Sequence, residues 1–191
     1  MALAPVLRDF LVRYQQTAVR QTGCRPLTWL RAPMDETLLL PGSPKPGYTC
    51  WQPVAWPNET PDLGAAAELF HHSIVEYVSM CQFLDIYFRL PVAHAGSPLS
   101  FLHGRTFAIC ANTESCPPSR ALEEAALYCR DRADMPLSYL MAATCDDGEP
   151  LMLFLRAQDG EALVCRLRGK PLELKLGLER LLPKLQFVYN I

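Results

Sequence analysis

The chain has 191 residues, of which 50% are hydrophobic, and a net charge of −2 at pH 7, values that fit one globular domain with a single core. Its apolar residues come in short runs, far below the roughly 18 consecutive residues that cross a bilayer, which argues against an integral membrane protein. Arg8 and Asp9 interrupt the first apolar run before a signal-peptide core can form, so we expect a cytoplasmic protein.

Eight cysteines are scattered along the chain, without a Cys-x-x-Cys pair. The four histidines do not fall at zinc-finger spacing to any cysteine pair. A chain of this length does not need disulfides to hold its core together. We therefore expect reduced, mostly buried thiols, and neither a metal nor another cofactor.

The charges are segregated along the chain. Residues 33–88 contain seven acids and a single base, Lys45, which gives a local net charge of −6 and leaves +4 for the rest. Segments 1–32 and 165–184 are correspondingly basic. One interpretation is that these are solvated faces that pair in the fold. The other is an electronegative surface that attracts a basic partner and disfavours nucleic acid.

The first third of the chain predicts a helix followed by a hairpin. Apolar residues at spacings of three and four predict a helix over about 4–22, which Gly23 ends. Residues 24–36 then read as a connector with one helical turn. A short apolar run, a turn rich in Pro and Gly, and the segment Tyr48–Pro53 predict a hairpin over about 37–53, because Pro53 cannot extend a strand.

The middle third contains the most strongly periodic stretch. Its apolar residues from Leu63 to Cys81 follow a helical repeat, and Asp62 is placed to cap the helix. The pattern then continues over 83–90 as a bent helix or as a strand, between which the sequence does not decide. Residues 91–98 are rich in Pro and read as a loop.

The last half predicts a third helix and then a meander. Ser119 can cap a helix that ends before Met135, and Asp-Gly turns separate apolar runs typical of hairpins. Leucines at helical spacing favour a closing helix. The expected elements are short strands or buried loop at 99–102 and 105–110, strands at 137–144, 151–155 and 162–167, and a helix over about 174–185. These elements mix helices with antiparallel hairpins.

No motif for catalysis is present. The chain has no Gly-x-Ser-x-Gly elbow, no phosphate-binding glycine loop and no His-Glu-x-x-His. A cysteine can still meet a distant histidine in the fold, and a thiol with a lowered pKa would support that alternative. Aromatic residues are not interleaved with bases, as they are in proteins that bind single-stranded nucleic acid. We expect a protein that is not an enzyme and does not bind nucleic acid.

Scattered residues along nearly the whole chain carry a family resemblance. They are Leu7-Arg8-Asp9-Phe10 with Arg13-Tyr14, the motif Trp51-Gln52-Pro53, Gln82-Phe83, Leu140–Thr144 and the leucine-rich end. In these the chain resembles Syd, the cytoplasmic SecY-interacting protein family of Gram-negative bacteria. Trp51-Gln52-Pro53 is the most specific of these matches. Residues 89–135 depart from the family pattern.

The resemblance implies a single α/β domain of the α+β type over 1–191, with a central, mostly antiparallel sheet flanked by helices, related to the SMI1/KNR4 superfamily. It implies a non-catalytic protein, expected to be a monomer, that docks on the basic cytoplasmic loops of the SecY translocation channel through a concave acidic surface. The protein would then lie on the cytoplasmic side of the inner membrane, associated with it only through the channel, and would monitor channel assembly. The partner-binding residues carried over are Glu59, Asp62, Glu68, Asp85, Glu76, Trp51 and Gln52.

Several of these residues have a second interpretation. Glu68 and Asp85 also fit ordinary solvated helix positions, and the family pattern does not require an acid at Glu76. Trp51 and Gln52 either contact the partner or serve only the fold. An immunity protein of the same superfamily, which holds a secreted toxin by an acidic face, is the alternative function. A toxin gene next to this one would favour that alternative.

Overall fold

The computed structural model describes residues 3–29, 35–57, 61–84, 86–91, 99–130, 132, 134–166 and 170–189. Its α-helices are α1 (Leu3–Thr22), α2 (His72–Ser79), α3 (Pro118–Arg130) and α4 (Leu178–Leu181). Single 3₁₀ turns are η1 (Glu36–Leu38), η2 (Ala65–Leu69), η3 (Ser100–Leu102) and η4 (Leu182–Lys184). The strands are β1 (Leu27–Trp29), β2 (Leu39–Leu40), β3 (Tyr48–Trp51), β4 (Tyr87–Arg89), β5 (Phe107–Ile109), β6 (Ser138–Thr144), β7 (Leu151–Arg156), β8 (Glu161–Arg166), β9 (Leu172–Gly177) and β10 (Gln186–Phe187).

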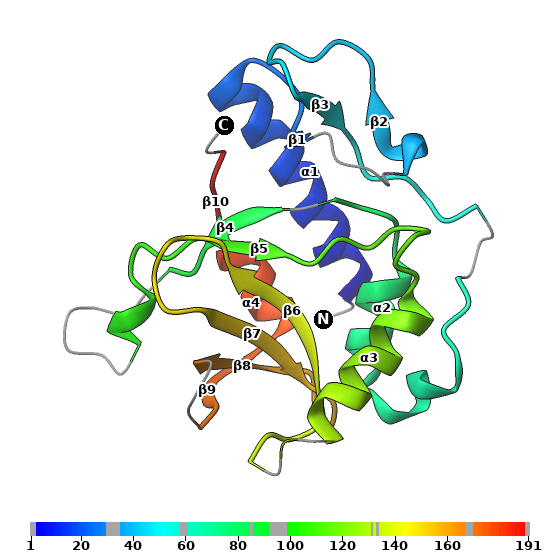
Figure 1. Cartoon of the computed structure of the whole chain (residues 1–191), viewed down its shortest axis with the longest axis vertical. Coiled ribbons are helices and arrows are strands. Elements are labelled where there is room, and N and C mark those ends of the chain that lie inside the picture. The colour runs from blue at the N-terminus through cyan, green and yellow to red at the C-terminus, as the bar shows by residue number, and fades with distance from the viewer. Residues whose placement is uncertain are drawn as a thin grey trace.

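These strands form two sheets in which every pairing is antiparallel. The larger sheet has seven strands in the order β10-β4-β5-β6-β7-β8-β9, and the smaller one has the order β1-β3-β2. Figure 1 shows the larger sheet curled, with the small sheet beside the C-terminal half of α1. The predicted α+β class with a mostly antiparallel sheet and flanking helices is confirmed.

Helix α1 supplies one wall of the core. Its buried side chains, among them Leu7, Phe10 and Tyr14, recur at spacings of three and four and therefore share one face. The helix ends at Gly23, whose φ of +75° suits a residue without Cβ and whose N–H donates to the Val19 carbonyl at 2.9 Å. The predicted helix over 4–22 is confirmed.

Strands β7 and β8 are covered on both faces. Leu153 and Leu155 point into the main core with α1 and α4, while Phe154, between them, belongs to a second cluster with Leu163 and Cys165 of β8. Successive side chains of a strand alternate between faces, so a strand buried on both sides must be apolar at nearly every position. Strand β7 meets this requirement, since its first five residues are all apolar.

The predicted helix from Asp62 to Cys81 is wrong in its first half. Asp62 does not cap a helix; its Oδ1 accepts a hydrogen bond from Gly64 N–H at 3.0 Å, and Gly64 has a φ of +63°. The chain then makes only the 3₁₀ turn η2 before α2 begins at His72. The break is set by tertiary contact, because His71 N–H donates to the Ala157 carbonyl at 2.6 Å and so leaves the helical ladder.

The predicted closing helix is also mostly wrong. Residues 172–177 form β9, and only Leu178–Leu181 are α-helical before η4. The β9 sequence alternates apolar and charged residues, a period of two that suits an edge strand. Leu27–Trp29, expected in a connector, forms β1 and pairs with β3.

Three shorter expectations have mixed outcomes. The hairpin over 37–53 is confirmed, with Leu40 opposite Cys50. The undecided stretch 83–90 contains strand β4, and of the two short segments after it 99–102 contains η3 and 105–110 contains β5. The predicted loop 91–98 lies, beyond Pro91, outside the described residues.

Candidate partner-binding surface and an adjoining cavity

The acidic segment, residues 61–84, carries three carboxylates and neither Lys nor Arg. Asp62 and Glu68 are exposed, and Glu76 of α2 is half-buried. Within the described part of the chain, none of the three forms an ion pair. The segment therefore presents uncompensated negative charge to solvent. The predicted site residues Glu59 and Asp85 lie outside the described residues.

Helix α3 adds a carboxylate to this segment. A Cβ at Gly64 would lie 3.2 Å from Ser119 Cβ and 3.5 Å from Glu123 Oε1, so α3 packs closely on the turn that carries Asp62. Glu123 is exposed there. Sequence reasoning misses Glu123, because nothing in a local pattern shows that α3 lies against residues 61–69.

The middle of the acidic segment is fixed to the large sheet, where His71 N–H donates to the Ala157 carbonyl. His71 is the N-cap of α2: its Nδ1 accepts from Ser73 N–H at 3.3 Å and lies 2.8 Å from Ser73 Oγ. Gly160, in the turn between β7 and β8, sits against this cap; a Cβ there would lie 2.4 Å from Ser73 Oγ. The acidic residues thus stand on a backbone that α3 and the sheet hold in place.

Trp51 lies inside the protein, and the backbone of Gln52 is bonded to a neighbouring segment. Trp51 is fully buried, its ring centroid is 5.8 Å from that of Tyr14, and its Nε1 has no hydrogen-bond partner among the described residues. Gln52 is half-buried, and its N–H donates to the Leu38 carbonyl at 3.1 Å. A docking partner cannot reach the Trp51 ring, which packs inside the protein.

The end of α2 is tied to two other segments. Gln82 pairs through its backbone with Val54, and its Oε1 accepts from Glu114 N–H at 3.2 Å. Asn112 Nδ2 donates to the carbonyls of Val78 and Cys81 at 2.7 and 2.8 Å, which satisfies the C-terminal end of α2. These bonds hold the segment 110–116 beside the acidic segment.

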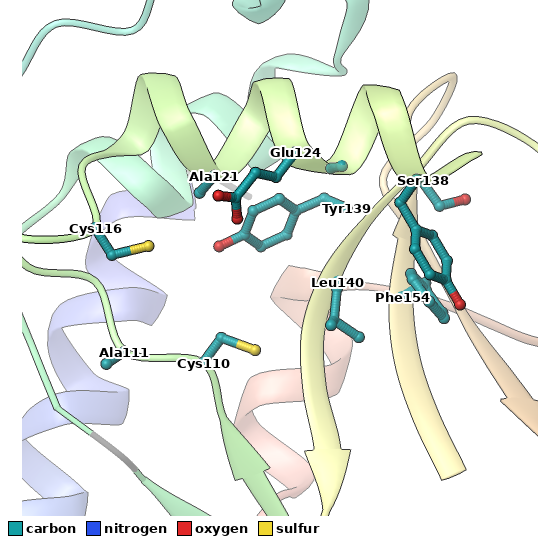
Figure 2. Close-up of a pocket in the computed structure, with 11 residues that line it drawn as sticks. Cys110, Ala111, Cys116, Ala121, Glu124, Ser138, Tyr139, Leu140 and Phe154 are labelled. Atoms are coloured by element: carbon teal, nitrogen blue, oxygen red, sulfur yellow. The ribbon is translucent and has the colours of Figure 1, made fainter. Parts of the chain in front are cut away.

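A cavity of about 460 Å³ lies between α3 and the large sheet, on the flank of α3 opposite η2. Figure 2 shows the segment 110–116 closing one side and α3 another. Glu124 stands at this cavity and forms an exposed ion pair with Arg120 at 2.8 Å. The lining residues are Cys110, Ala111, Cys116, Ala121, Glu124, Ala125, Tyr128, Ser138, Tyr139, Leu140 and Phe154.

Several cysteine thiols have a raised pKa, which makes them poorly suited to nucleophilic catalysis. Burial raises the pKa of the Cys116 thiol at the cavity, and Glu124 adds to this shift. Burial also raises the pKa of Cys81 to about 12 and that of Cys165 to about 11. A raised pKa leaves little thiolate at neutral pH, the opposite of what an activated cysteine needs. All eight cysteines are free thiols.

Among the described residues, no group of three or more His, Cys, Asp or Glu side chains is arranged to hold a metal ion. No helix there combines the length and the apolar composition that a membrane span requires.

Comparison with known proteins finds no family model that matches the chain and no curated protein that matches it significantly. The Syd resemblance therefore stays a prediction that rests on the residues named above.

Proposed function

We propose that the protein is a Syd-like docking protein that binds the basic cytoplasmic loops of the SecY channel through the acidic segment. The observation that carries the proposal is the exposure of Asp62 and Glu68, without ion-pair partners in the described chain, on a segment that lacks Lys and Arg. The function is binding and not catalysis.

The surroundings of these carboxylates suit recognition of a basic segment. Glu123 of α3 lies against the same turn and extends the negative charge beyond the acidic segment. Leu69, beside Glu68, is 55% exposed, and Leu127 of α3 is 51% exposed. Leu69 and Leu127 line one shallow groove. Acids next to exposed leucines favour a partner segment that is both basic and partly apolar.

Electrostatic attraction to basic loops would speed the encounter and would weaken as salt screens it. We expect the purified protein to co-sediment at low salt with membranes that contain SecY and to dissociate as the salt concentration rises. Equal binding to vesicles that lack the channel would contradict the proposal. An affinity pull-down from detergent-solubilised membranes identifies the bound protein and separates the channel from a toxin.

Charge reversal tests the placement of the surface. The double variant Asp62→Lys with Glu68→Lys should bind SecY membranes roughly tenfold more weakly while its melting temperature stays within about 2 °C of the wild type. The triple variant that adds Glu59→Lys should bind more weakly still. The control Asp147→Lys with Glu149→Lys changes the net charge equally on an exposed turn between β6 and β7. Equal losses in both doubles, or none in the first, would show that the surface is wrongly placed.

A further inference from the structure

The cavity between α3 and the large sheet has the features of a small-molecule site. Its volume of about 460 Å³ lies within the range of roughly 300–1,000 Å³ that is usual for ligand pockets. The space exists because alanines stand where larger residues would fill it. Ala121 and Ala125 do this on α3, and Ala111 does so on the facing segment.

The hydroxyl of one largely buried tyrosine points into the cavity. Tyr139 is only 5% exposed, and Figure 2 shows its ring and hydroxyl directed at the space below α3, toward Glu124 and Cys116. The described residues form no hydrogen bond with this hydroxyl. The hydroxyl of Tyr77, whose ring centroid is 6.3 Å from that of Tyr139, is buried and likewise has no partner among those residues. Tyr77 does not line the cavity, whereas the Tyr139 hydroxyl faces it and is available to donate a hydrogen bond to an acceptor atom on a ligand.

The lining selects the charge of the ligand. Glu124 is the charged residue among the lining side chains, which include no Lys, Arg or His. Burial and the nearby thiols of Cys110 and Cys116 raise the pKa of the Tyr139 hydroxyl, which therefore stays protonated and can donate. The lining offers an anionic ligand no base, because Arg120, next to the cavity, is already paired with Glu124.

The lining also favours an aromatic ligand. The ring of Tyr128 stacks on Phe154 at a centroid distance of 5.9 Å, and both line the cavity. Cys110 and Cys116 place sulfur atoms at the opposite side in Figure 2. Aromatic rings pack well against other rings and against sulfur.

We propose that this cavity binds a small, neutral aromatic molecule with one hydrogen-bond acceptor, which takes the hydrogen bond from the Tyr139 hydroxyl. This inference does not depend on the docking function, because the cavity and η2 lie on opposite flanks of α3.

A pair of probes of similar size and shape tests the hydrogen bond. 2-Acetylnaphthalene carries a carbonyl acceptor, and 2-ethylnaphthalene does not. Equilibrium dialysis against the full-length protein should show saturable binding of both, with the ketone about fivefold tighter because of the added hydrogen bond. In Tyr139→Phe the ketone should lose this advantage, while the affinity of the hydrocarbon should stay within twofold.

A second variant tests the location. Ala121→Phe fills the cavity from α3 and should abolish binding of both probes. The control Ala126→Phe makes the same change on the other flank of α3, where Ala126 lines the shallow groove, and should retain binding. Circular dichroism melting confirms that each variant is folded. Binding of the Ala121→Phe protein to SecY membranes should be unchanged, which separates this site from the docking surface.

The proposal is overturned if neither probe binds saturably up to its solubility limit, or if binding survives Ala121→Phe. A ketone without an advantage over the hydrocarbon in the wild type would remove the role of Tyr139. An equal loss of affinity for both probes in the folded Tyr139→Phe variant would also remove the role of Tyr139.

Discussion

Val54 and Gln82 pair in an antiparallel bridge, with N–H to O=C distances of 3.1 Å from Val54 and 2.8 Å from Gln82. This bridge joins the chain just after Trp51-Gln52-Pro53 to Gln82-Phe83 at the end of α2. Two of the motifs that carry the family resemblance are therefore neighbours in the fold. The bridge holds the two ends of the chain between Val54 and Gln82 together. It therefore restricts the positions that Asp62, Glu68 and Glu76 can take.

Replacing Asn112 should loosen this junction. Asn112→Ala removes two buried hydrogen bonds to the carbonyls of Val78 and Cys81. We expect the free energy of unfolding to fall by about 2–4 kcal/mol, because both carbonyls lose their partner in a buried site. Urea denaturation measures this change. The exposed neighbour variant Glu114→Ala serves as the control, and a loss below about 0.5 kcal/mol in Asn112→Ala would contradict the capping role.

Gly160 should be intolerant of any side chain. In Gly160→Ala the new Cβ would lie 2.4 Å from Ser73 Oγ and 3.1 Å from His71 Nδ1, at a φ of +72°. Gly42→Ala is a matched control, because Gly42 has a φ of +87° and no atom within 4 Å. We expect about 1 kcal/mol of destabilisation for the control and a further 1–3 kcal/mol for Gly160→Ala. Similar melting temperatures for the two variants would contradict this prediction. They would show that the side chains of His71 and Ser73 move aside at little cost in stability.

Asp146 should give the protein part of its acid sensitivity. The side-chain hydrogen bond from Arg105 lowers the pKa of Asp146, and Thr106 N–H donates to its Oδ2 at 3.0 Å. A carboxylate with a lowered folded-state pKa contributes stability above its unfolded pKa, near 3.8, and loses that contribution as the pH falls through the folded-state value.

Asp146→Asn should therefore lower the free energy of unfolding at pH 7 by about 1–2 kcal/mol and flatten its fall below pH 4. Denaturant titrations between pH 3 and pH 7 measure both effects. Asp147→Asn changes the exposed next residue and should leave the pH profile unchanged. Parallel profiles for the wild type and Asp146→Asn would contradict the assignment.

The cysteines should differ strongly in reactivity. Cys145 is exposed, whereas Cys81 and Cys165 are buried and have raised pKa values. Under native conditions at pH 7.5, we expect N-ethylmaleimide to modify Cys145 first and the two buried thiols about a hundredfold more slowly. Mass spectrometry of quenched samples gives the order. A buried thiol that reacts faster than Cys145 would instead support the enzyme alternative.

Local sequence patterns predicted the elements whose stability is local. The apolar face of α1 ending at Gly23, the hairpin of β2 and β3, and the apolar run of β7 were all visible as periodicity or turn chemistry. One failure came where two patterns competed. Leucines at 174 and 178 fit a helical spacing, but Leu172–Gly177 also alternates with period two, and pairing with β8 decided in favour of a strand.

The candidate sites also divide into features that local sequence reveals and features that depend on tertiary packing. Charge counting along the chain found the acidic segment, because the balance of acids and bases in a stretch of sequence can be read without knowing the fold. Glu123 beside Gly64, the buried Trp51 ring and the cavity under Tyr139 depend on segments far apart in sequence. No local sequence pattern shows that α3 packs against Gly64 on one flank and borders the cavity on the other.

The sequence alone thus determined helix α1, the hairpin of β2 and β3, the apolar strand β7, and the excess of acid in the middle third. Only the tertiary structure decided that the helix expected from Asp62 breaks before His71, that Val54 closes on Gln82, and that a cavity remains beneath α3. The physical reason is that periodicity and charge are properties of neighbouring residues. Hydrogen bonds such as that from His71 to Ala157 form only when distant segments are packed together.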